Sequence, residues 1–246
     1  MKIAIMQPYL FPYIGYFQLI NSVDLFVIHD DVQYIKGGWI NRNRILVNNC
    51  PFLFTFSLKK APSTLNINER YFSGAFMEEK KKLLRTLKSS YGKAEGYDEV
   101  SRLVEESLDV KHEDEDISKI ITSSLKLICN YLNIETPIVV SSEINKNNLL
   151  KGEERVIEIN KQLNSTHYIN PIGGLQLYNE ENFLKQDIKL NFLQSKPIVY
   201  PQGNEFIPWL SIIDVLMFNS KEKVRGFLGH YDLLRNNIVA EVENLG

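Results

Sequence analysis

Two short apolar runs, separated by a segment of helical length, constrain the fold of this chain most. The runs cover residues 2–6 and 23–28, and the segment between them covers residues 13–21. Short, continuous apolar runs bounded by turn residues are typical of strands that are buried on both faces. A strand, a helix and a second strand in so few residues therefore predict a βαβ unit with parallel strands.

The rest of the chain alternates between strand and helix patterns around a helical middle. The remaining strands are expected at residues 44–47 and 52–58, which form a hairpin, and at 137–140, 167–169 and 188–193. The remaining helices are expected at residues 75–90, 97–108, 116–132, 153–163, 180–185 and 212–218. This order predicts an α/β fold: a Rossmann-like, mainly parallel sheet with flanking helices, a β-hairpin and a mostly helical middle insertion.

The same pattern suggests three parts in the chain. Residues 1–74 form an N-terminal α/β part that carries the predicted site, and residues 75–135 form a helical insertion or subdomain. Residues 136–246 form a C-terminal α/β part that completes the same domain. The length of 246 residues suffices for a sizeable core.

Composition excludes several classes of protein. The formal net charge of −2 argues against a nucleic-acid-binding protein, which usually carries a basic excess. No apolar run reaches bilayer length, and no signal-peptide pattern is visible at the N-terminus. Cys50 and Cys129 fit a reducing compartment better than a disulfide scaffold. We expect a cytoplasmic protein without membrane insertion or nucleic-acid partner. The sequence does not decide between a monomer and a homodimer.

Polar side chains gather directly after the first two apolar runs. Gln7 and Tyr9 follow the first run, and His29, Asp30 and Asp31 follow the second. In an open parallel sheet, ligands bind outside the carboxyl ends of the strands, so both groups are expected at one crevice. The following stretch adds more polar and aromatic candidates: Gln33, Tyr34, Lys36, Trp39, Asn41 and Arg42.

This density of polar groups is costly to bury unless the groups are paired or bound to a ligand. We therefore predict that one pocket at the carboxyl edge is lined by Gln7, Tyr9, Asp30, Asp31, Gln33, Asn41 and Arg42. Pro8 and Pro12 would stiffen its loop. The alternative is a structural turn whose aromatics seal the end of the sheet, and we favour the site for the segment as a whole.

Two later segments contain weaker candidates. Gly173 and Gly174 follow a predicted strand, where paired glycines allow a ligand to approach the backbone. Gln202 and Glu205 lie in a proline-aromatic segment and are candidate ligand contacts. In the same region Ser211 and Asp214 have the spacing of a helix-capping pair.

Other residue patterns point away from several chemistries. Three histidines are expected in ordinary positions: a solvated one for His112, a packed one for His167 and a helix end for His230. No Ser-His-Asp order can be assigned. Neither cysteine has a nearby histidine, so a cysteine nucleophile and a metal site are not expected. The Gly-rich dinucleotide and P-loop motifs are missing, as are hexapeptide repeats.

The N-terminal segments MQPYLFPYIGYFQLI and DLFVIHDDVQYIKGGWINRNRI resemble the WbqC-like protein family of bacteria, and the match continues through YINPIGGLQLY and EFIPWLSIIDVLM. Members of this family are encoded among O-antigen and other surface-polysaccharide genes. The resemblance implies a transferase of polysaccharide biosynthesis that moves glycine or another acyl group to a sugar.

On this basis we expect an N-acyltransferase or aminoacyltransferase that acts on a nucleotide-linked amino sugar. The expected donor is an activated acyl or aminoacyl group, for example an acyl-CoA or a carrier-protein thioester. His29 is the natural general base, oriented by Asp30 or Asp31, and either carboxylate is the alternative base. Gln7, Asn41 and Arg42 offer hydrogen-bond donors for an oxyanion.

The other residues have binding roles in this hypothesis. Lys36 and Arg42 suit a phosphate, while Tyr9, Tyr34 and Trp39 can stack on a sugar or a base. An accessory protein that binds a nucleotide sugar or a partner enzyme without chemistry is the alternative. Nucleotidyl transfer is less favoured, because the first loop has Pro12 and Tyr13 in place of the phosphate-gripping histidines of such enzymes.

Overall fold

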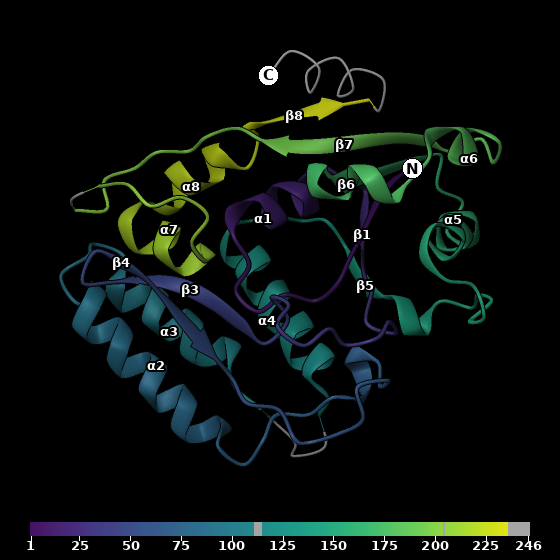
Figure 1. The fold of residues 1–246 in the computed structure, drawn as a ribbon. Coiled ribbons are helices and arrows are strands. Elements are labelled where there is room, and N and C mark those ends of the chain that lie inside the picture. The colour runs from purple at the N-terminus through teal and green to yellow at the C-terminus, as the bar shows by residue number, and fades with distance from the viewer. Residues whose placement is uncertain (111–114, 204, 236–246) are drawn as a thin grey trace.

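A mostly parallel sheet runs through the fold, and its strands come from both ends of the chain (Figure 1). The computed structural model describes residues 1–110, 115–203 and 205–235. Among these residues the strands of the sheet, in spatial order, are β5 (Ile138–Val140), β2 (Leu25–Ile28), β1 (Lys2–Met6), β6 (His167–Pro171), β7 (Lys189–Ser195) and β8 (Tyr231–Leu234). All neighbours are parallel except β7 and β8.

The predicted βαβ unit is confirmed. β1 pairs in parallel with β2, so that Ile5 lies opposite Val27, and helix α1 (Ile14–Asn21) connects the two strands. On its other side β1 pairs with β6, and the chain order of the strands reverses there. The order is that of a Rossmann-like sheet, which has its switch point between β1 and β6.

Helices cover both faces of the sheet (Figure 1). One face packs against α5 (Gly152–Gln162) and α6 (Glu180–Leu184), which contribute buried side chains such as Val156 and Phe183. The opposite face packs against α1, α4 (Ile117–Tyr131), α7 (Ile212–Phe218) and α8 (Lys221–Phe227). Burial on both faces explains why the parallel strands are continuous apolar runs rather than alternating ones.

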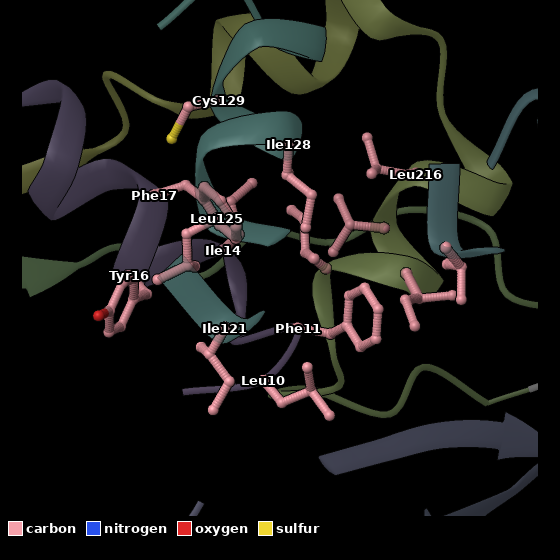
Figure 2. Packing of buried hydrophobic residues seen from close by; sticks show 14 of the residues in the cluster. Leu10, Phe11, Ile14, Tyr16, Phe17, Ile121, Leu125, Ile128, Cys129 and Leu216 are labelled. Atoms are coloured by element: carbon pink, nitrogen blue, oxygen red, sulfur yellow. The ribbon is translucent and has the colours of Figure 1, made fainter. Parts of the chain in front are cut away.

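The segment after β1 is partly core. Figure 2 shows Leu10 and Phe11 beside Ile121 of α4, and both side chains are at most 1% exposed. Phe11 has a φ of 46°, which turns the chain so that α1 begins three residues later. Tyr16 lies in the same core and donates a hydrogen bond from its hydroxyl to the Gln7 carbonyl, 2.8 Å away.

The predicted hairpin and the helical middle lie next to the sheet. β3 (Arg42–Val47) and β4 (Cys50–Thr55) form a separate antiparallel pair. Asn48 and Asn49 both have positive φ values, as a two-residue hairpin turn requires. α2 (Phe76–Tyr91) and α3 (Tyr97–Ser107) follow the hairpin, and α3 packs with α4. Short 3-10 helices cover Ile67–Glu69, Ser141–Glu143 and Ile172–Leu177.

Most boundaries agree with the sequence pattern to within about two residues, the usual uncertainty of helix ends. The pattern did not predict α8 or β8, because both are short and half-exposed and β8 is an edge strand. Ser211 caps α7 as expected, but the expected capping role of Asp214 is wrong, since its carboxylate binds other side chains. His112 lies outside the described residues. No helix in the described part of the chain has the length and apolar character needed to cross a bilayer.

Candidate functional site

The carboxyl edge of the sheet places residues from three strands side by side. Met6 is paired with Ile28, and Ile28 with Val140, so the next residues of the three strands occupy one row. These residues are Gln7, His29 and Ser141. The backbone N–H of His29 donates to the Met6 carbonyl at 2.7 Å, which extends the ladder beyond the last paired residues. The expected proximity of the first two strand ends is therefore present.

Asp31 is the centre of a buried charged cluster at this edge. Its carboxylate lies 2.6 Å from the Lys146 ammonium and 2.5 Å from the Arg155 guanidinium. The hydroxyl of Ser141 also donates to it. Burial by itself would raise the pKa of Asp31, but the hydrogen bonds from Lys146 and Ser141 and the two positive charges outweigh this effect and lower it. The three charged side chains together have a formal charge of +1.

His29 lies beside this cluster as a neutral imidazole. Burial, the largest cause, lowers its pKa to about 4, against the opposing effect of the Asp31 charge. The charges of Arg155 and Lys146 lower the pKa further. The buried Nε2 of His29 has no hydrogen-bond partner among the described residues. An imidazole of this kind is neutral at neutral pH, and its Nε2 is buried without a partner among the described residues.

Asp30 points away from the Asp31 cluster into a separate set of hydrogen bonds. It accepts hydrogen bonds from the backbone N–H and the hydroxyl of Ser142, at 2.9 and 2.5 Å, and from the Asn68 amide at 3.3 Å. Its residue surface is only 3% exposed. These bonds tie the ends of β2 and β5 together, so Asp30 has a structural role. The carboxylate whose charge acts on the pKa of His29 is that of Asp31.

A cavity of about 730 Å³ opens at the carboxyl ends of β6 and β7. Its walls include Tyr13 and Ile14 at the start of α1, Gly173 after β6, and residues 193–198 at the end of β7. Segment 206–210 completes the wall. This is the side of the switch point where Rossmann-like folds bind ligands, and the volume suits a ligand of nucleotide-sugar size. We name it the large cavity.

Several predicted site residues bind the protein backbone instead of facing this edge together. Gln33 donates to the Ser63 carbonyl, and Asn41 donates to the Phe56 carbonyl. Arg42 donates to the carbonyls of Gly37 and Gly38. The hydroxyl of Tyr34 donates to the Asn41 side chain at 2.9 Å, and Lys36 is exposed. These contacts hold the segment before β3.

Some of the other predicted site residues line a cavity, and others pack or bind within the protein. Gly173 lines the large cavity, whereas a Cβ on Gly174 would lie 1.9 Å from the Asn170 amide nitrogen, so that glycine serves close packing. Gln202 is buried and donates to the Asp214 carboxylate at 2.7 Å. Glu205 is exposed beside the cavity wall. Tyr9 and Trp39 line a second, smaller cavity.

The other two histidines that the structure describes are His167 and His230. A ring nitrogen of His167 lies 2.8 Å from the Asn191 side-chain oxygen at the amino end of β6, and His230 is exposed. Within residues 1–110, 115–203 and 205–235, no group of three or more His, Cys, Asp or Glu side chains is placed to hold a metal ion.

Sequence reasoning missed Lys146 and Arg155, the two cations of the Asp31 cluster. They come from the loop after β5 and from the first turn of α5, far from Asp31 in the chain. One signal could have indicated the region, because the strand predicted at residues 137–140 is followed directly by Ser141 and Ser142. The carboxyl end of a third parallel strand belongs to the same edge.

Sheet order and flanking helices define this chain as a Rossmann-like α/β protein. The model of the WbqC-like protein family matches residues 7–226, so the chain belongs to that family. The uncharacterized protein Rv1507c of Mycobacterium tuberculosis (strain ATCC 25618 / H37Rv) is 30% identical over 223 residues, which cover 89% of this chain and 93% of that protein. No solved structure matches the chain.

Proposed function

We propose that this protein transfers an acyl or aminoacyl group, such as glycyl, to the amine of a nucleotide-linked amino sugar in surface-polysaccharide (O-antigen) biosynthesis. The observation that supports this proposal most is the neutral His29 imidazole beside the Asp31 cluster, whose buried Nε2 has no hydrogen-bond partner among the described residues. Amide formation requires a group that accepts a proton from nitrogen and a positive environment for the carbonyl oxygen.

The chemical step makes one bond and breaks one. The sugar amine attacks the carbonyl carbon of the activated acyl donor, and the carbonyl oxygen becomes an oxyanion. The attacking nitrogen becomes more acidic than a free ammonium once the N–C bond forms, and the neutral imidazole of His29 accepts its proton. The bond to the thiol or other leaving group then breaks, and the leaving group takes up the proton from His29.

The Asp31 cluster supplies the positive environment in this scheme. Lys146 and Arg155 outnumber Asp31 in charge, and their side chains are only 1% and 10% exposed, so water screens them weakly. The buried Nε of Arg155 has no partner among the described residues. Buried, fixed donors of this kind stabilise developing negative charge without reorganisation.

The experiment combines the purified protein with nucleotide-linked amino sugars and acyl or glycyl thioesters, and detects the acylated sugar by mass spectrometry. We expect His29→Gln to lower kcat by about 10²- to 10⁴-fold, while His167→Gln at the opposite end of the sheet keeps full activity. Product formation that is insensitive to His29→Gln would remove His29 from the reaction. No product with any donor and sugar would contradict the transferase proposal.

A second candidate function is an accessory protein that binds the nucleotide sugar without chemistry. It is favoured by the complete pairing of Asp31 with Lys146, Arg155 and Ser141, which leaves this carboxylate poorly suited to accept a proton. In this case the wild-type protein and the His29→Gln variant would both bind nucleotide sugars, and neither would form product. Calorimetric binding alongside the mass assay separates the two functions.

A further inference from the structure

A second cavity, of about 200 Å³, lies where three distant segments of the chain meet. We name it the aromatic cavity. Its lining residues come from the loop after β1, from the entry and first part of β3, and from the segment before α7: Tyr9, Pro12, Tyr13, Trp39, Asn43, Arg44 and Trp209. It adjoins the large cavity, because Tyr13 and Trp209 line both.

Hydrogen bonds fasten the three segments to one another. The Asn43 amide donates to the carbonyls of Leu10 and Phe11, at 3.0 and 2.7 Å. The Ser211 hydroxyl also donates to the Phe11 carbonyl at 2.7 Å, and the Ser211 backbone N–H donates to the Arg44 carbonyl at 2.8 Å. The walls of the aromatic cavity are therefore held in place without a ligand.

Four aromatic side chains face this small space. The rings of Tyr13 and Trp209 are 5.8 Å apart and nearly perpendicular. Trp209 is 56% exposed and has a φ of 61°, an unusual conformation for a bulky residue. Strained residues of this kind concentrate at ligand clamps. An exposed, strained tryptophan is costly to a structure, and it is well placed to stack on a bound planar group.

Positive charge accompanies the aromatic rings. The Arg44 guanidinium lies 5.3 Å from the centre of the Trp39 ring, and the Arg42 guanidinium lies 5.6 Å from it. The buried Nε of Arg44 has no hydrogen-bond partner among the described residues. The described residues that line the cavity include no carboxylate. The site therefore suits a ligand that combines a planar ring with an anionic group.

We propose that the aromatic cavity binds the nucleoside diphosphate of the nucleotide-linked sugar, with the base against the aromatic rings and a phosphate at Arg44. A volume of about 200 Å³ is smaller than the pockets that hold whole ligands, about 300–1,000 Å³, so the cavity encloses part of the nucleotide rather than all of it. This inference rests on the proposed function for the nucleotide-linked nature of the substrate.

Intrinsic tryptophan fluorescence tests the proposal directly, because Trp39 and Trp209 are the two tryptophans of the sequence. Titration with UDP, GDP, ADP, CDP and dTDP, without sugar or acyl donor, is expected to change the emission with at least one of them. We expect Arg44→Gln to weaken binding about tenfold or more and Trp209→Leu to weaken it roughly 5- to 150-fold. Arg85→Gln, on the exposed face of α2, serves as the matched control and keeps wild-type affinity.

Thermal unfolding of each variant shows whether it folds, and Trp209→Leu keeps the test valid if Arg44→Gln does not fold. The inference is overturned if no nucleoside diphosphate binds, or if binding does not depend on Arg44 and Trp209. Binding of a free amino sugar with the same dependence, without nucleotide binding, would overturn it in favour of a sugar-stacking site. Nucleotide binding without any acyl transfer would contradict the proposed function and leave this inference intact.

Discussion

At the scale of single residues, His29 shows how a fold changes the chemistry of a side chain. Its position after the second strand is visible in the sequence, but its ionisation is not. Burial lowers the pKa of the imidazole to about 4, from an ordinary value near 6.5. The unfolded chain therefore takes up a proton, as the pH falls through this interval, that the folded protein does not bind.

We expect the free energy of unfolding to fall by roughly 3 kcal/mol between pH 6.5 and pH 4 because of His29 alone. The loss occurs on acidification, because between these pH values the unfolded chain binds a proton at His29 and the folded protein does not. Urea unfolding across this pH range should show a flatter profile for His29→Gln, whereas His230→Gln, with an exposed side chain, should follow the wild type. Equal slopes for both variants would rule out this role of His29.

At the scale of elements, close contacts between helices depend on single glycines. Gly96 precedes α3, and a Cβ at this position would lie 2.5 Å from the Leu216 carbonyl oxygen of α7. Backbone atoms cannot turn aside as the end of a flexible side chain can. Gly226 in α8 is different, because a Cβ there meets nothing within 4 Å.

Gly96→Ala is expected to lower the free energy of unfolding by about 1–3 kcal/mol, because α3 and α7 must move apart. Gly226→Ala is the matched control, and we expect it to raise the free energy of unfolding by up to about 1 kcal/mol through helix propensity. Both values come from urea denaturation midpoints at constant slope. A neutral Gly96→Ala would mean that the contact between α3 and α7 is not tight.

At the scale of the whole molecule, one buried carboxylate connects parts of the chain that are far apart in sequence. Asp214 of α7 accepts hydrogen bonds from the hydroxyls of Tyr91 and Tyr200, at 2.7 and 2.6 Å, and from Gln202. Tyr91 ends α2 and also accepts a hydrogen bond from the Leu46 backbone N–H. Burial raises the pKa of Asp214 although all three donors lower it. The cluster holds the segment around Tyr200 against the large cavity.

Tyr91→Phe should lower the free energy of unfolding by about 1–3 kcal/mol, because Asp214 loses a donor and the Leu46 N–H loses its acceptor. The matched control is Tyr71→Phe. The Tyr71 hydroxyl makes no hydrogen bond within the described part of the chain, so we expect this substitution to change the free energy of unfolding by no more than about 0.5 kcal/mol. Thermal and urea unfolding measure both. Equal effects of the two substitutions would show that the Asp214 cluster contributes no net stability.

The sequence by itself determined the parallel βαβ opening, the hairpin and most helices, because local periodicity and turn residues reflect which faces become buried. It also indicated that the ends of β1 and β2 meet, since parallel strands share one carboxyl edge. It did not indicate β8, whose pairing with β7 depends on a neighbour rather than on its own pattern.

Only the tertiary structure decided what the polar residues of that edge do. Gln33, Asn41 and Arg42 bind nearby carbonyls, which no composition or spacing distinguishes from ligand contacts. Asp31 finds its partners Lys146 and Arg155 in a loop and a helix more than a hundred positions along the chain. The ionisation of His29 and the pairing of Asp31 depend on burial and on charges brought near by folding, and these are properties of three-dimensional position rather than of local sequence.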